Sequence, residues 1–351
     1  MSEMSCSPVA SETPSSVTVE LVETAALGTI VAHYLLRGTL GLTLDVLTLA
    51  GSRNRSLARA GFWAIERLVD PPARVMLPPR GTRRRLVQFK DFRAEWLWDT
   101  TVADPKSAQD AAILYLHGGA FIACGLNTHR RMVAKIAQAT GVPALNVDYR
   151  QLPDAHVTDS LDDAMRAYRY LLDRGFAPER IILSGDSAGG GLALRLAQAV
   201  RDAGYAAPAA ISVVSPWADF DSARRHAHRN TFRDAYLPGN GPDMVVRQGF
   251  SIDGAIDPSW SPVNNDFAGL PPILIQVGSD ELLLPDSETL AQRCEEAGVP
   301  TRLQIWHRAP HVHQIGADIL RDARNALADL VAFNRQALVG EAASTAGVSA
   351  A

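Results

Sequence analysis

Lysine and cysteine are both scarce in this sequence of 351 residues. The three cysteines, Cys6, Cys124 and Cys294, are an odd number whose spacing fits no metal motif. This argues against a disulfide framework and a metal site, and it predicts reduced thiols in a cytoplasmic protein. A formal net charge of -4 leaves no basic excess, which argues against a nucleic-acid partner. The basic run from Arg80 to Arg85 is interpreted as a solvated loop before a strand.

The sequence also lacks a long uninterrupted apolar run. The stretch Leu21–Leu49 is rich in apolar residues but is broken by Glu23, His33, Arg37 and Asp45. Its longest uncharged part is shorter than the roughly 18 apolar residues of a membrane span. We therefore predict one or two helices packed on the protein body and no stable membrane span, with contact at a membrane surface as the alternative. Residues 1–16 lack the basic and apolar regions of a signal peptide and are expected to be disordered.

Short apolar runs alternate with helical patterns over most of the chain. The first two strand patterns, near 86–89 and 94–98, predict a hairpin at one edge of a sheet. Later strands are expected at 112–116, 142–147, 181–183, 210–214, 273–277 and 301–305. Helices are expected at 129–140, 160–174, 188–203, 287–297 and 316–336. This alternation predicts an α/β protein whose mostly parallel sheet is covered by helices on both faces.

Two segments depart from the alternation. Residues 17–80 have a helical pattern that ends in a proline-rich loop. Residues 219–250 are polar and Arg-rich without a strand pattern. Long segments of this kind in an α/β domain are usually lids near the site. The predicted organisation is a tail over 1–16, a helical cap over 17–80, a catalytic domain over 81–338 with a cap insertion at about 219–250, and a flexible tail over 339–351.

The segment Ser184–Gly190 carries a Gly-x-Ser-x-Gly motif between a strand pattern and a helical pattern. This context is typical of a nucleophile elbow, a tight turn that exposes a serine hydroxyl above the sheet. Side chains would collide in such a turn, which explains why Gly185 and Gly189 flank Ser187. The alternative is a simple glycine-rich turn, and the strand and helix on either side make it the weaker interpretation. Ser187 is therefore the candidate nucleophile.

A second glycine motif, His117-Gly118-Gly119-Ala120, directly follows the strand pattern at 112–116. Glycine lets backbone N–H groups approach a substrate oxygen closely. Gly118 and Gly119, together with the N–H group of Ala188, are the predicted oxyanion hole. His117 belongs to this loop, which makes it a poor candidate for the catalytic base.

The runs His117–Phe121, Val147–Arg150 and Gly185–Gly190 together resemble the hormone-sensitive-lipase-like branch of the α/β-hydrolases, the bacterial family IV esterases. The resemblance extends from about residue 85 to the end of the last helix. It implies an α/β-hydrolase fold with a helical cap, and hydrolysis of carboxylic esters through an acyl-enzyme without cofactor or metal. The sequence departs from the family pattern at Ala120, where a third glycine is commoner, and in the run that follows Arg150, and neither departure touches the chemistry.

The catalytic acid is expected between the nucleophile and the histidine in chain order. The run Val277–Leu282 follows a strand and resembles the acid turn of the family. We predict Asp280 as the acid, with Glu281 and Asp286 as rivals. Asp286 is better explained as a cap or dipole partner near the start of the following helix.

Three histidines, His307, His311 and His313, follow the last strand pattern. The family places its catalytic histidine before a valine and just ahead of the final helix, which favours His311. In this prediction Asp280 orients the imidazole of His311, which takes the proton from Ser187 and later gives it to the leaving alcohol.

Several further residues lie near the expected site. Trp217 and Phe220 follow a strand end and are candidates for the acyl pocket, with core packing as the alternative. The run Asp148–Arg150 is interpreted as fixing a loop beside the oxyanion turn. Cys124 is interpreted as a small buried hydrophobic residue.

These residues favour a serine carboxylesterase that acts on short- to medium-chain acyl esters. The expected partner is a small-molecule ester, and a homodimer remains open. Amidase or deacetylase chemistry on the same machinery is the nearer alternative. A non-catalytic binding protein of the same fold is the remoter one, because candidates for the whole triad are present. An epoxide hydrolase or dehalogenase is disfavoured, because those enzymes carry an aspartate at the elbow.

Overall fold

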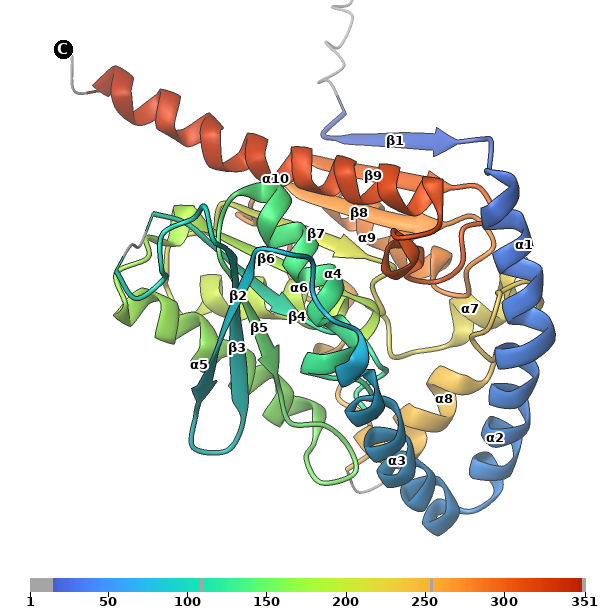
Figure 1. Ribbon diagram of the computed structural model, residues 1–351. Coiled ribbons are helices and arrows are strands. Elements are labelled where there is room, and N and C mark those ends of the chain that lie inside the picture. The colour runs from blue at the N-terminus through green and yellow to red at the C-terminus, as the bar shows by residue number, and fades with distance from the viewer. Residues whose placement is uncertain (1–14, 108–109, 253–254, 349–351) are drawn as a thin grey trace, which may run out of the picture.

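A nine-stranded sheet forms the centre of the computed structural model, which describes residues 15–107, 110–252 and 255–348 (Figure 1). The strand order across the sheet is β1-β9-β8-β7-β6-β4-β5-β3-β2. Strands β2 and β3 form an antiparallel hairpin, β3 runs antiparallel to β5, and the other neighbours are parallel. The strands are β1 Val17–Val22, β2 Thr82–Gln88, β3 Arg93–Asp99, β4 Ala112–Leu116, β5 Ala144–Asp148, β6 Ile181–Asp186, β7 Ala210–Val214, β8 Ile273–Gly278 and β9 Thr301–Trp306.

Helices cover both faces of this sheet, as the sequence predicts. Helices α4 (Leu126–Thr140) and α10 (Arg321–Val348) contact each other on one face. Helices α5 (Val157–Asp173), α6 (Ser187–Asp202) and α9 (Leu284–Glu296) cover the other. Strands β4, β6, β7 and β8 are buried at every position, which explains why their sequences are mostly apolar. The predicted α/β fold with its antiparallel edge is confirmed.

The two ends of the chain differ from the prediction. Residues 17–22, expected to begin a helical segment, form β1, which pairs in parallel with β9 at the sheet edge. The alternation of Val17, Val19 and Leu21 with polar residues is a strand pattern that the helical interpretation overlooked. At the other end, α10 continues to Val348, so most of the predicted tail at 339–351 is helical. Residues 1–14 of the predicted N-terminal tail lie outside the described residues.

The two predicted cap segments pack against each other. The first contains α1 (Leu27–Leu36), a π-helical turn (Arg37–Gly41), α2 (Leu42–Arg53) and α3 (Arg55–Val69). The second contains α7 (Ala223–Ala227) and α8 (Gly241–Val245), and α8 contacts α2. Short π or 3-10 turns also occur at Pro71–Val75, Pro178–Arg180, Arg229–Phe232, Val246–Phe250, Pro258–Trp260, Pro262–Asn264 and His313–Gly316.

Helices α1 and α2 join into one continuous helical rod, Leu27–Arg53, along one side of the molecule (Figure 1). By length and composition alone the rod could cross a membrane, with a mean hydropathy of 1.3 in its most apolar window. The sequence-based expectation that charged residues break this stretch too often is therefore not met. Only 11% of that window is buried inside the protein.

Candidate active site

Ser187 lies at the turn from strand β6 into helix α6. Its φ angle is +52°, a left-handed value that is costly for a residue with a side chain. A Cβ atom on Gly185 would come 2.6 Å from the carbonyl oxygen of Leu116, and one on Gly189 would come 2.1 Å from the same atom. Both positions therefore require glycine, and the predicted nucleophile elbow is confirmed as a structure.

His311 lies in the loop after β9 and connects Ser187 to an acidic residue. Its Nε2 is 2.9 Å from Ser187 Oγ, and its Nδ1 is 2.7 Å from Glu281 Oε2. All three side chains are buried. Burial alone lowers the pKa of His311, but the charge and hydrogen bond of Glu281 outweigh it and raise the pKa above its ordinary value. The chain from hydroxyl to imidazole to carboxylate is the arrangement that activates a serine.

The prediction of Asp280 as the acid is wrong, because Glu281 holds that position. Gly278 to Glu281 form a tight turn in which the Glu281 N–H donates to the Gly278 carbonyl. Asp280 is at the third position of this turn and is partly exposed, whereas Glu281 returns toward the end of β8. There Glu281 Oε1 accepts hydrogen bonds from Gly278 N and Ser215 Oγ, which leaves Oε2 for His311.

The other two histidines are not in contact with Ser187. His307 is exposed, and its backbone N–H donates to Val22. His313 is buried beside the ring of Trp306, and burial lowers its pKa to about 4. The choice of His311 over its neighbours is therefore supported by the geometry of the loop.

Asp286, the second rival for the acid, has a structural role instead. Its Oδ2 accepts from the N–H groups of Ala218 and Asp219, and its Oδ1 lies 3.0 Å from the Arg225 guanidinium. These partners come from the segment after β7, so Asp286 does not cap the helix, although it lies in the first turn of α9 where a carboxylate complements the helix dipole. The ion pair between Asp286 and Arg225 is almost fully buried and fixes the loop that carries Trp217 and Phe220.

Replacing Arg225 with methionine is expected to lower the free energy of unfolding by about 3–5 kcal/mol, because the buried Asp286 carboxylate then loses its cation. Urea denaturation followed by circular dichroism measures this change. A matched control is Glu296→Ala, which breaks an exposed ion pair with Arg293 and is expected to cost less than about 1 kcal/mol. Equal effects of the two substitutions would contradict the structural role of the buried pair.

The loop His117–Ala123 passes directly beside the elbow. A Cβ atom on Gly118 would come 3.0 Å from Ser187 Cβ and 2.2 Å from Asp186 Oδ2. Gly119 has a φ of +120°, and its carbonyl accepts hydrogen bonds from the N–H groups of Ile122 and Ala123. Ala188 is fully buried in the first turn of α6. The backbone groups predicted to form the oxyanion hole thus approach Ser187 from two sides.

Buried polar contacts hold this loop from behind. Asp186 accepts a hydrogen bond from Tyr115 Oη at 2.8 Å and lies 3.2 Å from His129 Nε2. Burial by itself raises the pKa of Asp186, but His129 outweighs it and keeps the pKa below the ordinary value. Tyr149 Oη donates to the carbonyl of His117 at 2.7 Å, and the two rings stack. Tyr149 therefore fixes the loop beside the oxyanion turn as predicted, whereas the Arg150 guanidinium pairs with Asp163 instead.

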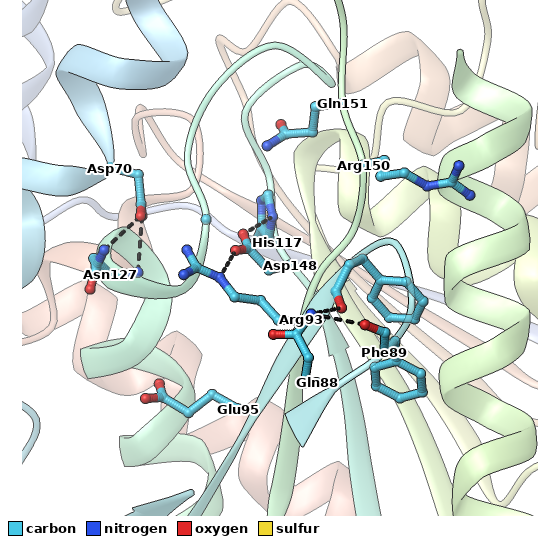
Figure 2. A network of polar contacts seen from close by, with 12 residues as sticks. Asp70, Gln88, Phe89, Arg93, Glu95, His117, Asn127, Asp148, Arg150 and Gln151 are labelled. Atoms are coloured by element: carbon cyan, nitrogen blue, oxygen red, sulfur yellow. Dashed lines mark hydrogen bonds and ion pairs between the residues drawn. The ribbon is translucent and has the colours of Figure 1, made fainter. Parts of the chain in front are cut away.

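Figure 2 shows how these contacts extend toward the cap. Asp148 pairs with Arg93 at 2.6 Å and lies 3.9 Å from His117 Nε2. Asp70, at the end of α3, accepts hydrogen bonds from the backbone of Asn127 and Thr128 at the start of α4. A carboxylate at this position also complements the helix dipole. The first cap segment is thereby tied to the catalytic domain within a few residues of the oxyanion loop.

Residues Gly191 and Leu192, four and five positions after Ser187 in α6, line a cavity of about 190 Å³. Phe121, Leu192, Phe220 and Trp260 are among the side chains that line it. Trp217 does not line it; the indole packs against Phe220 and donates to the carbonyl of Asp219. Phe220 therefore has a position suited to an acyl pocket, whereas Trp217 packs against Phe220 outside the cavity.

Three residues at this site were missed in the sequence: Tyr236, Ser215 and Asp186. Tyr236 Oη donates to the carbonyl of His311 at 3.0 Å, and Ser215 Oγ donates to Glu281. Only Asp186 carried a signal, its place inside the serine motif. Cys124 is partly buried, and its surroundings raise the pKa of its thiol to about 12 by desolvation. Within the described ranges, no group of three or more His, Cys, Asp or Glu side chains is placed to bind a metal ion.

Comparisons with known proteins agree with this geometry. A family model described as α/β hydrolase fold matches residues 113–315. Esterase LipU of Mycobacterium tuberculosis (strain ATCC 25618 / H37Rv) is 36% identical over 276 residues, which are 77% of this chain and 92% of that protein. Carboxylesterase/phospholipase LipF of the same strain is 34% identical over 275 residues, which are 77% of this chain and 73% of that protein.

Solved structures extend the similarity to the whole fold. An esterase from the bacterial hormone-sensitive lipase family superposes with a TM-score of 0.72 at 31% identity, covering 84% of this chain and 98% of its own. EstE5 soaked with p-nitrophenyl butyrate gives a TM-score of 0.76 at 31% identity and covers 90% of this chain and 100% of its own. The chain therefore belongs to the α/β-hydrolase-fold family, among the hormone-sensitive-lipase-like esterases.

Proposed function

We propose that this esterase hydrolyses short- to medium-chain acyl esters of small molecules through an acyl-enzyme on Ser187. The observation that carries the proposal is the unbroken hydrogen-bonded chain from Ser187 to His311 to Glu281, with lengths of 2.9 and 2.7 Å. The homologues named as esterases support the same reaction class. The chemistry needs only the three side chains of this hydrogen-bonded series and the neighbouring backbone donors.

In the proposed mechanism, His311 Nε2 accepts the hydroxyl proton while Ser187 Oγ attacks the ester carbonyl. The N–H groups of Gly118, Gly119 and Ala188 donate to the oxyanion that forms. His311 then gives the proton to the departing alkoxide, which leaves the acyl group on Ser187. A water molecule, deprotonated by His311, repeats the attack and releases the acid. Glu281 holds the Nδ1–H tautomer and stabilises the imidazolium in both steps.

Labelling with a fluorophosphonate probe tests the nucleophile directly. We expect one adduct, on the peptide that contains Ser187, and loss of p-nitrophenyl butyrate hydrolysis in proportion to labelling. Matched p-nitroanilides, assayed in parallel, separate an esterase from an amidase. Faster turnover of the anilide, or an adduct on another serine, would contradict the proposal.

Replacing Phe220 with alanine is expected to shift the acyl preference toward longer chains. Phe220 lines the cavity beyond Ser187, and its removal leaves room for added methylenes. Each buried methylene contributes about 0.8 kcal/mol, so we expect roughly a tenfold rise in the kcat/KM ratio of decanoate to butyrate ester. The comparison variant is Trp260→Ala, which removes another side chain that lines the same cavity. An unchanged ratio in Phe220→Ala would place the acyl group elsewhere.

We further propose that the enzyme works in the cytoplasm. The sparse cysteines and the raised thiol pKa values of Cys124 and Cys294, both caused by burial, suit reduced thiols. Cell fractionation with antibody detection tests this location, and recovery in a secreted fraction would contradict it.

A further inference from the structure

The helical rod Leu27–Arg53 turns its apolar side chains away from the protein. Leu27, Val31 and Leu35 follow one another at intervals of four and are 76%, 54% and 63% exposed. Val46 and Leu47 in α2 are 68% and 50% exposed. In Figure 1 the rod forms the outer margin of the molecule. The exposed side chains thus form an apolar strip along the rod, of a kind that marks interaction surfaces.

The opposite side of the rod, which faces the protein, carries polar side chains. Thr29 donates to Asp322 at 2.8 Å, and His33 is buried. Arg37 donates to the carbonyls of Asp234 and Phe232. An ordinary surface helix buries its apolar side and exposes its polar side. The rod has the reverse arrangement, so its outward strip lacks the apolar neighbours that such residues normally have within the fold.

Arginine and tryptophan are exposed on the next helix, α3, which packs against α2. Arg59, Trp63 and Arg67 are spaced four residues apart and are exposed, and the Arg67 guanidinium lies 3.9 Å from the Trp63 ring centre. From Arg53 to the end of α3 at Val69 the sequence holds four arginines and one acidic residue, although the whole chain is acidic. Tryptophan and arginine next to an apolar strip are typical of helices that lie at a membrane–water interface.

We propose that α1–α3 form a docking surface for a lipid membrane that carries anionic headgroups. In this arrangement the strip of Leu27, Val31, Leu35, Val46 and Leu47 enters the upper part of the bilayer, and the arginines of α3 contact the headgroups. This surface is separate from the catalytic residues and does not depend on the proposed reaction.

The rod lies on the membrane in this proposal and does not cross it. Strand β1, just before the rod, pairs with β9, and Asp70, after α3, binds the start of α4. Both ends are therefore held by the same hydrolase body. A crossing would also break the hydrogen bonds of Thr29 and Arg37 and carry Asp45 into hydrocarbon.

A membrane fits this surface better than a second copy of the chain. A symmetric dimer through α1–α3 would put the arginines of both copies into one interface, and an excess of like charge there opposes association. Anionic headgroups complement the same arginines.

Sedimentation with lipid vesicles tests the docking surface. We expect the full chain to sediment with vesicles of phosphatidylcholine and phosphatidylglycerol, and to bind pure phosphatidylcholine about tenfold more weakly. Raised salt is expected to weaken binding to the anionic vesicles. Absence of binding to the anionic vesicles, or equal binding to both kinds, would overturn the proposal.

Three variants identify the residues involved. Leu35→Ser with Val46→Ser, and separately Arg59→Ser with Arg67→Ser, are each expected to weaken binding about tenfold or more. Val339→Ser is the matched control, because Val339 is 67% exposed but lies in the far half of α10, and it is expected to bind normally. Equal loss in the control would overturn the assignment to α1–α3. Circular dichroism and hydrolysis of p-nitrophenyl butyrate without vesicles check that each variant is folded.

Two further measurements separate this proposal from its rivals. Ser187→Ala is expected to bind vesicles like the wild type, so failure of the proposed reaction leaves vesicle binding intact. Light scattering after gel filtration detects dimers. The proposal would be overturned if the wild type binds no vesicles and forms a dimer that the double variant, Leu35→Ser with Val46→Ser, does not form. The strip would then be an interface with a second copy of the chain.

Discussion

Replacing Ser187 with alanine is expected to lower kcat for p-nitrophenyl butyrate by about 10⁶-fold, the scale seen when a serine hydrolase loses its nucleophile. The substitution removes only Oγ, the atom 2.9 Å from His311 Nε2. Alanine keeps the Cβ atom, so the strained φ of +52° and the packing of the elbow are unchanged. Stopped-flow and steady-state rates against active-site-titrated wild type measure the loss.

The matched control for this prediction is Ser184→Ala, three residues earlier in β6. Ser184 Oγ is also buried and donates to the Ser212 carbonyl, but it does not contact His311. Its loss is expected to cost about 1 kcal/mol of stability and to leave kcat within a few-fold of wild type. A Ser187→Ala enzyme that retains a tenth of the wild-type kcat would exclude Ser187 as the nucleophile.

The elbow and the oxyanion loop could be predicted from the sequence because their geometry is local. Gly185 and Gly189 leave space for backbone atoms of Leu116, and such close approaches permit only glycine. The positions of the buried strands along the chain were readable for a related reason, since strands covered on both faces of a sheet are mostly apolar. Local patterns of this kind can be recognised in a single sequence.

Features that depend on distant partners could not be predicted in the same way. The choice between Asp280 and Glu281 rests on a turn that directs Glu281 to His311 and leaves Asp280 partly exposed. Strand β1 exists because β9 offers a free edge nearly 300 residues later. Asp286 resembles a helix cap until Arg225 and the N–H groups after β7 are placed beside it. In each case tertiary contacts decide between two locally acceptable conformations.

Replacing Glu281 with glutamine is expected to lower kcat by about 10³–10⁴-fold, while Asp280→Asn stays within a few-fold of wild type. The side-chain oxygen of the introduced glutamine can still accept from Gly278 N and Ser215 Oγ. Its NH₂ group then faces His311 Nδ1 and donates to it. The imidazole proton must move to Nε2, where it faces Ser187, and the ring can no longer take the serine proton. Equal losses in the two variants would contradict the assignment of Glu281.

The pH profile provides an independent test of the same contact. The Glu281 carboxylate raises the pKa of His311 against the effect of burial. The reaction needs neutral His311, so wild-type kcat/KM falls as the pH drops through this raised pKa. In Glu281→Gln the anion is gone while burial remains, which lowers the pKa of His311. The residual activity is therefore expected to persist to lower pH than in the wild type, whereas Asp280→Asn keeps the wild-type acid limb. An acid limb that moves upward in Glu281→Gln would mean that the carboxylate does not act on His311.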